Sequence, residues 1–143
     1  MKKILIVGIE NTCRSIVAAE YLKKTVKEKG KNGVEVSCAG VRAFPDIPAD
    51  PSAVAGLKSL GIEGEFKSRP LSKQEVADAA LIITMEPRIK GAISGKFPDK
   101  APVIFTLKEL AGDGDGEVAA DGNLASVVKE LIDRSFEKIT ENE

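Results

Sequence analysis

The chain has 143 residues, enough to bury one sizeable core. Its hydrophobic fraction of 43% and charged fraction of 30% are ordinary for a globular protein. The net charge of −1 gives no sign of a broad nucleic-acid or membrane surface. No apolar run approaches the roughly 18–20 residues that span a bilayer. We therefore expect one cytoplasmic domain over residues 1–143 that binds neither nucleic acid nor a membrane.

The numbers of cysteine and histidine residues limit the kinds of metal site and of catalysis that the chain can support. The chain has no histidine and two cysteines, Cys13 and Cys38. Two cysteines make no disulfide framework and, without histidine, no zinc ligand set. The lack of histidine also excludes Cys-His and Ser-His-Asp catalysis, so acid–base chemistry would fall to carboxylates, lysine, tyrosine or thiol. We expect neither a metal nor a cofactor.

Strand and helix patterns alternate along the chain. Continuous apolar runs are typical of parallel strands covered on both faces, and apolar residues every three or four positions are typical of helices with one buried face. The expected strands are residues 2–7, 34–39, 80–85 and 102–106, and the expected helices are 15–29, 51–60, 72–78, 87–96 and 124–139. This alternation implies an α/β fold with a doubly wound parallel sheet.

Several element ends carry local signals. Ser15 is expected to cap the first helix, which Gly30 ends. Ser72, with Glu75 three residues later, predicts a capping box at the start of a brief helix. Residues 112–122, which read GDGDGEVAADG, are expected to form a flexible acidic loop.

The loop after the first strand carries an anion-binding pattern. In doubly wound sheets, ligands bind beyond the carboxyl ends of the strands. Backbone N–H groups at a helix N-terminus attract an anion, and the Arg14 guanidinium can grip two oxygens. Asn11 tolerates the left-handed conformation that such a loop needs. The residues expected to form a site for a phosphate-sized oxyanion are Gly8, Ile9, Glu10, Asn11, Thr12, Cys13 and Arg14.

The sequence around this loop resembles the low-molecular-weight protein tyrosine phosphatase family, whose signature is a strand, V-C-x-G-N-x-C-R-S and a helix. Residues 7–15 read VGIENTCRS. The likeness extends over nearly the whole chain, through EVSCAGV, PADPSAVAGLKSLGI, KSRPL, ADAALIITME and FPDK. It implies a four-stranded sheet of flavodoxin-like order 2-1-3-4 with helices on both faces, and a phosphate or phosphorylated ligand. It identifies no protein partner.

The family's reaction begins with a thiolate at the first loop position, which attacks phosphotyrosine to give a cysteinyl-phosphate. Gly8 stands at this position and has no side chain that could attack phosphorus. The family's arginine corresponds to Arg14, which is expected to bind the oxyanion in the transition state. The family's general acid is an aspartate in a late D-P-aromatic loop. Asp121 is its expected counterpart, although Gly-Asn follows it, and Asp115 is the competing candidate.

Other expectations from the resemblance concern the surroundings of the loop. Ser15 is expected to support the loop. Cys38 stands where the family has a bracing serine, and Phe66 stands near its bracing histidine. Glu10 replaces a loop glycine. Phe44 is expected to form an apolar wall of the substrate cleft.

The binding residues match the family better than the chemical ones. We interpret the chain as a catalytically inactive relative that retains a phosphate site and works as a binding or regulatory module. The alternative is a working phosphomonoester hydrolase whose nucleophile is Cys13, or a water activated by Glu10 or Asp121. A position beside Arg14 at a helix N-terminus would lower the pKa of the Cys13 thiol. Arsenate reduction, a third hypothesis, requires a nucleophilic cysteine and resolving thiols that the chain lacks.

Overall fold

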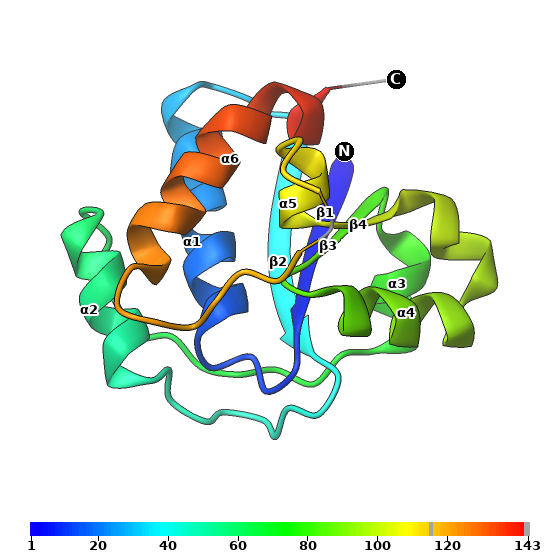
Figure 1. The fold of residues 1–143 in the computed structure, drawn as a ribbon, viewed down its shortest axis with the longest axis horizontal. Coiled ribbons are helices and arrows are strands. Elements are labelled where there is room, and N and C mark those ends of the chain that lie inside the picture. The colour runs from blue at the N-terminus through cyan, green and yellow to red at the C-terminus, as the bar shows by residue number, and fades with distance from the viewer. Residues whose placement is uncertain (115, 142–143) are drawn as a thin grey trace.

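A parallel sheet forms the centre of the computed structural model, which describes residues 1–114 and 116–141. Among these residues, four strands lie in the order β2-β1-β3-β4, which confirms the expected topology (Figure 1). The strands are β1 (Lys2–Gly8), β2 (Val34–Gly40), β3 (Leu81–Thr84) and β4 (Ile104–Thr106). The parallel register places Gly8 opposite Gly40, so both glycines lie at the carboxyl end of the sheet.

Helices cover both faces of the sheet (Figure 1). One face carries α1 (Arg14–Glu28), α2 (Pro51–Ser59) and α6 (Leu124–Thr140), the other carries α3 (Lys73–Asp78) and α4 (Pro87–Lys96), and the short helices η1 (Pro98–Val103) and α5 (Leu107–Leu110) flank β4. In the part of the chain that the structure describes, none of these helices has the length and apolar character needed to cross a membrane.

Alternate side chains of β1 enter two separate cores. Ile4 and Ile6 pack with residues of α1, α2 and α6, whereas Leu5 and Val7 pack with residues of α3 and α4. All four side chains are at most 2% exposed. Burial on both faces explains why this strand reads as a continuous apolar run, and it fixes the position from which the next loop begins.

The expected helix ends are confirmed at several positions. The N–H of Glu75 donates to Ser72 Oγ at 3.1 Å, and the Glu75 carboxylate accepts from the N–H of Ser72 at 3.2 Å, which completes the capping box. Gly30 and Gly61 follow α1 and α2 with φ angles of 66° and 80°. Such angles favour glycine because a side chain would be strained there.

The segment around β4 differs from the expectation. The strand begins at Ile104 rather than residue 102, because the preceding residues form the 3₁₀ helix η1. The short helix α5 is an addition to the expected elements. It opens with a capping box between Thr106 and Glu109, so the same signal that marks α3 is present in the sequence.

The segment expected to be a flexible acidic loop is tied to the rest of the fold. Val118 is fully buried, and its N–H donates to the carbonyl of Met85 at 2.8 Å. Asp113 accepts a hydrogen bond from Arg134 of α6 at 2.6 Å. The residues around Val118 therefore lie against the carboxyl end of β3, beside the loop that follows β1.

Candidate oxyanion-binding site

The loop between β1 and α1 lines a cavity of about 230 Å³ at the carboxyl end of the sheet. All the residues expected to bind an oxyanion, 8–14, line this cavity, together with Ser15. Three further residues that matter for its charge and shape are Asp50, Glu86 and Ala120. The cavity therefore lies where the sequence places the candidate site, and its binding of an oxyanion stays a prediction.

The loop uses its carbonyl groups but leaves its N–H groups unpaired. The carbonyls of Gly8, Ile9 and Thr12 accept hydrogen bonds at 2.8–3.0 Å from the N–H groups of residues 41, 42 and 50. The N–H groups of residues 9–15 donate to no acceptor within the described ranges. Consecutive unpaired donors at the start of a helix form an anion-binding arrangement, since the helix dipole adds positive potential there.

Asn11 holds the loop in shape. Its φ angle is 59°, which confirms the expected left-handed conformation, and its side chain is 2% exposed. Asn11 Nδ2 donates to Ser15 Oγ at 2.9 Å, and Asn11 Oδ1 accepts from the N–H of Arg69 at 2.9 Å. The loop is therefore braced from both ends by one buried amide. Nothing in the sequence points to the backbone of Arg69 as a partner.

Ser15 supports the loop but does not cap α1, which corrects the expectation. The helix begins at Arg14, and the N-cap residue is Cys13, whose side chain makes no capping hydrogen bond. Ser15 lies inside the first turn, where its hydroxyl accepts from Asn11 instead of from the helix backbone. The first N–H groups of α1 consequently remain available to an anion.

Cys38 lies beside Asn11 at the carboxyl end of β2. Burial raises the pKa of its thiol, and the neighbouring Asn11 amide opposes this effect. The guanidinium of Arg69 donates to the Cys38 carbonyl. The same arginine thus contacts the loop through its backbone and β2 through its side chain. Cys38 and Cys13 are both free thiols.

Gly8 leaves room for a neighbouring hydroxyl. A Cβ at position 8 would lie 2.8 Å from Ser15 Oγ and 3.1 Å from Ser15 Cβ. Such distances are shorter than ordinary contacts of this kind, so Ser15 occupies the space next to Gly8.

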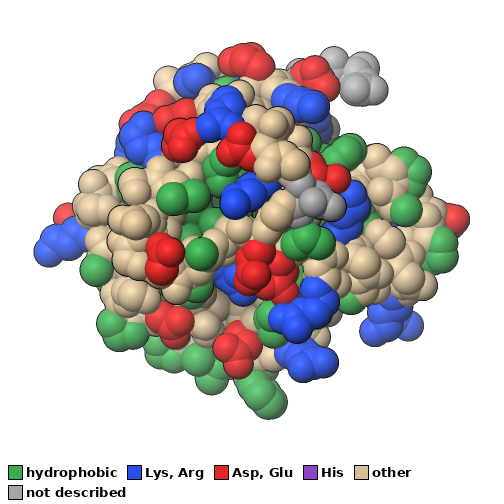
Figure 2. Space-filling model, viewed as in Figure 1, with side chains coloured by type: hydrophobic (Ala, Val, Ile, Leu, Met, Phe, Trp, Pro, Cys, Tyr) green, Lys and Arg blue, Asp and Glu red, His purple; other side chains and the backbone are tan. Residues whose placement is uncertain are grey.

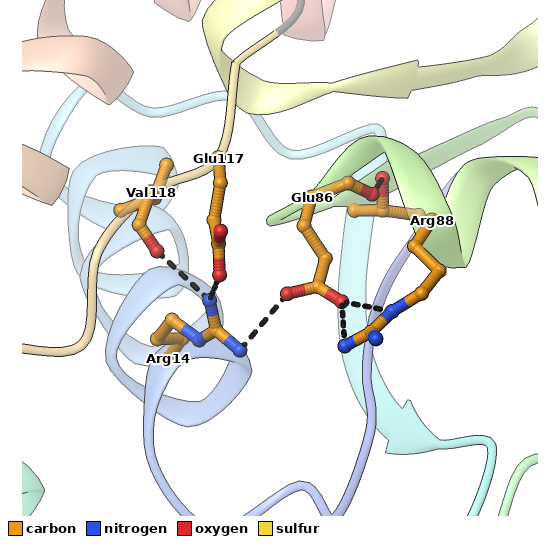
Figure 3. Close-up of polar contacts among 6 residues, drawn as sticks. Arg14, Glu86, Arg88, Glu117 and Val118 are labelled. Atoms are coloured by element: carbon orange, nitrogen blue, oxygen red, sulfur yellow. Dashed lines mark hydrogen bonds and ion pairs between the residues drawn. The ribbon is translucent and has the colours of Figure 1, made fainter.

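Arg14 lines the cavity, but its guanidinium contacts two carboxylates (Figure 3). Nη1 donates to Glu117 Oε2 at 2.9 Å and to the Val118 carbonyl at 3.0 Å, and Nη2 donates to Glu86 Oε2 at 3.2 Å. Glu86 is 4% exposed, and its other oxygen accepts from Arg88. Figure 2 shows acidic and basic side chains adjacent to one another near the middle of this face.

These two carboxylates are site residues that the sequence reasoning missed. Glu86 directly follows the buried strand β3, at the edge where ligands bind, and this position is the signal that could have found it. Glu117 is one of several acidic residues in its segment, and the sequence does not distinguish it from the others. The hydrogen bond from Arg14 holds the pKa of the Glu117 carboxyl below its ordinary value.

Cys13 has the opposite pKa shift to the one expected. Burial raises the pKa of its thiol, and Asp50 adds to the rise, whereas Ser52 and Arg14 act in the other direction. The expectation that Arg14 and the helix terminus would lower the pKa is therefore wrong, because removal from water outweighs them. The thiol form dominates at neutral pH.

The candidates for the general acid lie away from the loop cavity or outside the described residues. Asp121 lines a neighbouring cavity of about 650 Å³, which also meets Cys13. Its carboxylate accepts from the N–H of Asn123 at 2.8 Å. Ala120 is the residue next to it that reaches the loop cavity. Asp115 lies outside the described residues.

Phe44 stands on the loop after β2 with 75% of its surface exposed. Val41 and Ile47 of the same loop are also exposed. Figure 2 shows hydrophobic side chains along the lower edge of the molecule, where Figure 1 places this loop. The role of Phe44 as a cleft wall stays a prediction, because its ring stands out from the surface.

Residues 3–124 match the sequence profile of the family described as low molecular weight phosphotyrosine protein phosphatase. A protein-arginine-phosphatase from Geobacillus stearothermophilus is 35% identical over 96% of this chain and 95% of its own length. A probable low molecular weight protein-tyrosine-phosphatase EpsP from Ralstonia solanacearum is 36% identical over 77% of this chain and 73% of its own length.

Solved structures agree with these sequence relationships. The structure of the YwlE arginine phosphatase from Geobacillus stearothermophilus superposes with a TM-score of 0.86 at 34% identity and covers 97% of this chain and 93% of that one. A low molecular weight protein tyrosine phosphatase from T. tengcongensis superposes with a TM-score of 0.88 at 31% identity, over 96% of this chain and 99% of that one. This chain belongs to the low molecular weight phosphotyrosine protein phosphatase family.

Proposed function

We propose that this protein is a catalytically inactive member of its family that binds a phosphoryl group and works as a binding or regulatory module. The observation that carries the proposal is the loop itself. The N–H groups of residues 9–15 are unpaired among the described groups and surround a cavity, while the first loop position is Gly8. Such a loop can hold phosphoryl oxygens but has no side chain at the position of attack.

No other side chain in the loop replaces the missing nucleophile. Ser15 Oγ is the hydroxyl nearest to Gly8, and its hydrogen-bond partner is the Asn11 amide, a donor that cannot take its proton. A serine attacks phosphorus only when a base accepts that proton. Cys13 is held in its thiol form because burial raises its pKa. A thiol is a far weaker nucleophile than a thiolate.

The ligand that we propose is a phosphorylated protein side chain. Relatives of this chain are named as arginine and tyrosine phosphatases. Glu10 and Asp50 line the cavity and are exposed. Their carboxylates would attract the guanidinium of phosphoarginine and add nothing for a neutral phenyl ring. We therefore propose that a phosphoarginine peptide binds more tightly than the matching phosphotyrosine peptide.

A combined binding and turnover experiment tests the proposal. Purified protein would be titrated with inorganic phosphate by calorimetry and incubated with an aryl phosphate and a phosphoarginine peptide. We expect phosphate binding that Arg14→Ala weakens, and no turnover above the rate of Arg14→Ala. Lys24→Ala, which removes a cation that pairs with Glu28 within α1, is the control and should bind as the wild type does.

The alternative of a working hydrolase makes a different prediction. Turnover that Arg14→Ala abolishes would overturn the proposal, as would a phosphoryl adduct detected by intact mass spectrometry. Cys13→Ser then identifies the nucleophile, because only a thiol mechanism is lost in that variant. Water activated by Glu10 or Asp121 would survive Cys13→Ser and fail in Glu10→Gln or Asp121→Asn. Arsenate reduction is tested in the same protein by arsenite release.

A further inference from the structure

Ser15 has a hydrogen-bond donor that nothing in the described protein uses. The side chain is 2% exposed and lines the loop cavity. Its oxygen accepts from Asn11 Nδ2 at 2.9 Å, which fixes one side of the hydroxyl, and its own proton meets no acceptor among residues 1–114 and 116–141. A buried hydroxyl normally donates as well as accepts, because an unused buried donor is costly. This proton is therefore free for a ligand.

Gly8 is what makes this hydroxyl accessible from the cavity. A side chain at position 8 would begin 2.8 Å from Ser15 Oγ and would separate it from a bound anion. The φ angle at position 8 is not positive, so glycine supplies space here and no unusual backbone conformation. The absence of a side chain at Gly8 thus leaves the Ser15 hydroxyl open to the cavity.

Glycine in place of a cysteine at position 8 also changes the charge next to the ligand. A thiolate at position 8 would place a negative charge against the phosphoryl group. Ser15 is neutral and adds a donor to those of the loop backbone. A hydrogen bond from a neutral donor to an anionic oxygen is among the stronger hydrogen bonds in proteins.

We propose that the Ser15 hydroxyl donates to an oxygen of the bound phosphoryl dianion, so that the position opposite the missing nucleophile serves ligand binding. This inference rests on the proposed function, because it requires that the loop binds a phosphoryl group. Ser15 is a binding residue in this account and takes no part in bond cleavage.

The test is a calorimetric titration with inorganic phosphate. Ser15→Ala should weaken binding by about tenfold, the effect of one hydrogen bond to a charged group. Ser135→Ala is the matched control, because this serine is also 2% exposed and lies in α6, where it donates to the Leu131 carbonyl. Its affinity should equal that of the wild type. A proton spectrum of the phosphate complex should show the Ser15 hydroxyl as a slowly exchanging signal coupled to phosphorus.

A second measurement covers a structural effect of removing the serine. If the amide signals of residues 9–14 show that free Ser15→Ala has a disturbed loop, the proton spectrum of the wild-type complex decides, since it reports the Ser15 hydrogen bond without any substitution. Wild-type affinity in Ser15→Ala with an undisturbed loop, or absence of the phosphorus-coupled hydroxyl signal from the wild-type complex, overturns the inference and leaves the proposed function standing. Absence of phosphate binding by the wild type overturns both.

Discussion

The Glu117 carboxylate lies 2.9 Å from the Arg14 guanidinium. An acidic residue of the protein therefore pairs with the same cation that would bind a phosphoryl ligand. Glu117 is exposed, whereas Glu86 on the other side of Arg14 is buried. The two carboxylates therefore have different consequences. The buried one fixes the direction of the guanidinium, and the exposed one can leave when a stronger anion arrives.

Removal of this competition should strengthen ligand binding. We predict that Glu117→Gln increases the affinity for inorganic phosphate by about two- to fivefold, the range expected for an exposed ion pair. Calorimetric titration at low salt measures the change. Glu63→Gln, which alters an exposed carboxylate in the turn after α2, serves as the control and should have no effect. An equal gain in both variants would show that only the net charge matters.

The same ion pair has a defined pH dependence. Arg14 holds the pKa of Glu117 below its ordinary value, so the ion pair is fully present above the ordinary carboxyl range and is lost as the pH falls through the lowered pKa. We predict that the affinity ratio between Glu117→Gln and the wild type is constant from neutral pH to mildly acidic pH and approaches one at lower pH. Because the ratio cancels the titration of phosphate itself, titrations of both proteins across this range are sufficient. A ratio that changes near neutrality contradicts the assignment.

Thiol reactivity should report the burial of both cysteines. Burial raises the pKa of Cys13 and of Cys38, so less thiolate is present at neutral pH than in an unfolded chain. We predict that iodoacetamide modifies both residues more slowly in the native protein than in urea, with native rates that still rise in the alkaline range where an unfolded thiol is already ionised. Mass spectrometry of tryptic peptides measures each site. Fast modification of native Cys13 at neutral pH would favour the thiol mechanism.

Asn11 should contribute to the stability of the fold. Asn11→Ala removes two side-chain hydrogen bonds and forces alanine into a left-handed conformation, with a cost of about 2–4 kcal/mol in the free energy of unfolding. Asn11→Gly keeps the conformation accessible and loses only the hydrogen bonds, so its cost should be smaller by about 1 kcal/mol. Urea unfolding of the three proteins measures both values. Equal stability of the two variants would show that the backbone conformation costs nothing.

A cysteine introduced at position 8 should give only slow phosphatase chemistry. Gly8→Cys places a Cβ 2.8 Å from Ser15 Oγ, so the hydroxyl must move, at a cost of about 1–3 kcal/mol in stability. We predict slow turnover of an aryl phosphate with a phosphoryl adduct on the introduced thiol, because Asp121 lies in the neighbouring cavity and proton donation stays weak. Family-like rates in this variant would show that the acid and the loop supports are intact.

The fold and the loop can be predicted well because both depend on local patterns. The apolar run of β1 reports burial on two faces, and the segment from Gly8 to Arg14 lies at the carboxyl end that every doubly wound sheet offers to a ligand. These features depend on neighbours in the chain. The helix α5 also has a local signal, the Thr106–Glu109 capping box, although the expected elements do not include this helix.

The rest of the site depends on partners that are far apart in sequence. Arg14 is expected to offer its guanidinium to a ligand, but it meets Glu117, 103 positions later. The hydroxyl of Ser15 is expected to cap a helix, yet it accepts from a buried Asn11. The pKa of Cys13 depends on how much of it the fold removes from water, which no local pattern states. Such properties follow from tertiary packing.

The hydrogen bond between Asn11 and the backbone of Arg69 joins positions 58 residues apart. A nascent chain that has emerged only as far as β2 therefore lacks one of the two restraints on its anion loop. Arg14 meets Glu117 later still, after most of the polypeptide has left the ribosome. During synthesis, Arg69 therefore becomes available to the loop before Glu117 becomes available to Arg14.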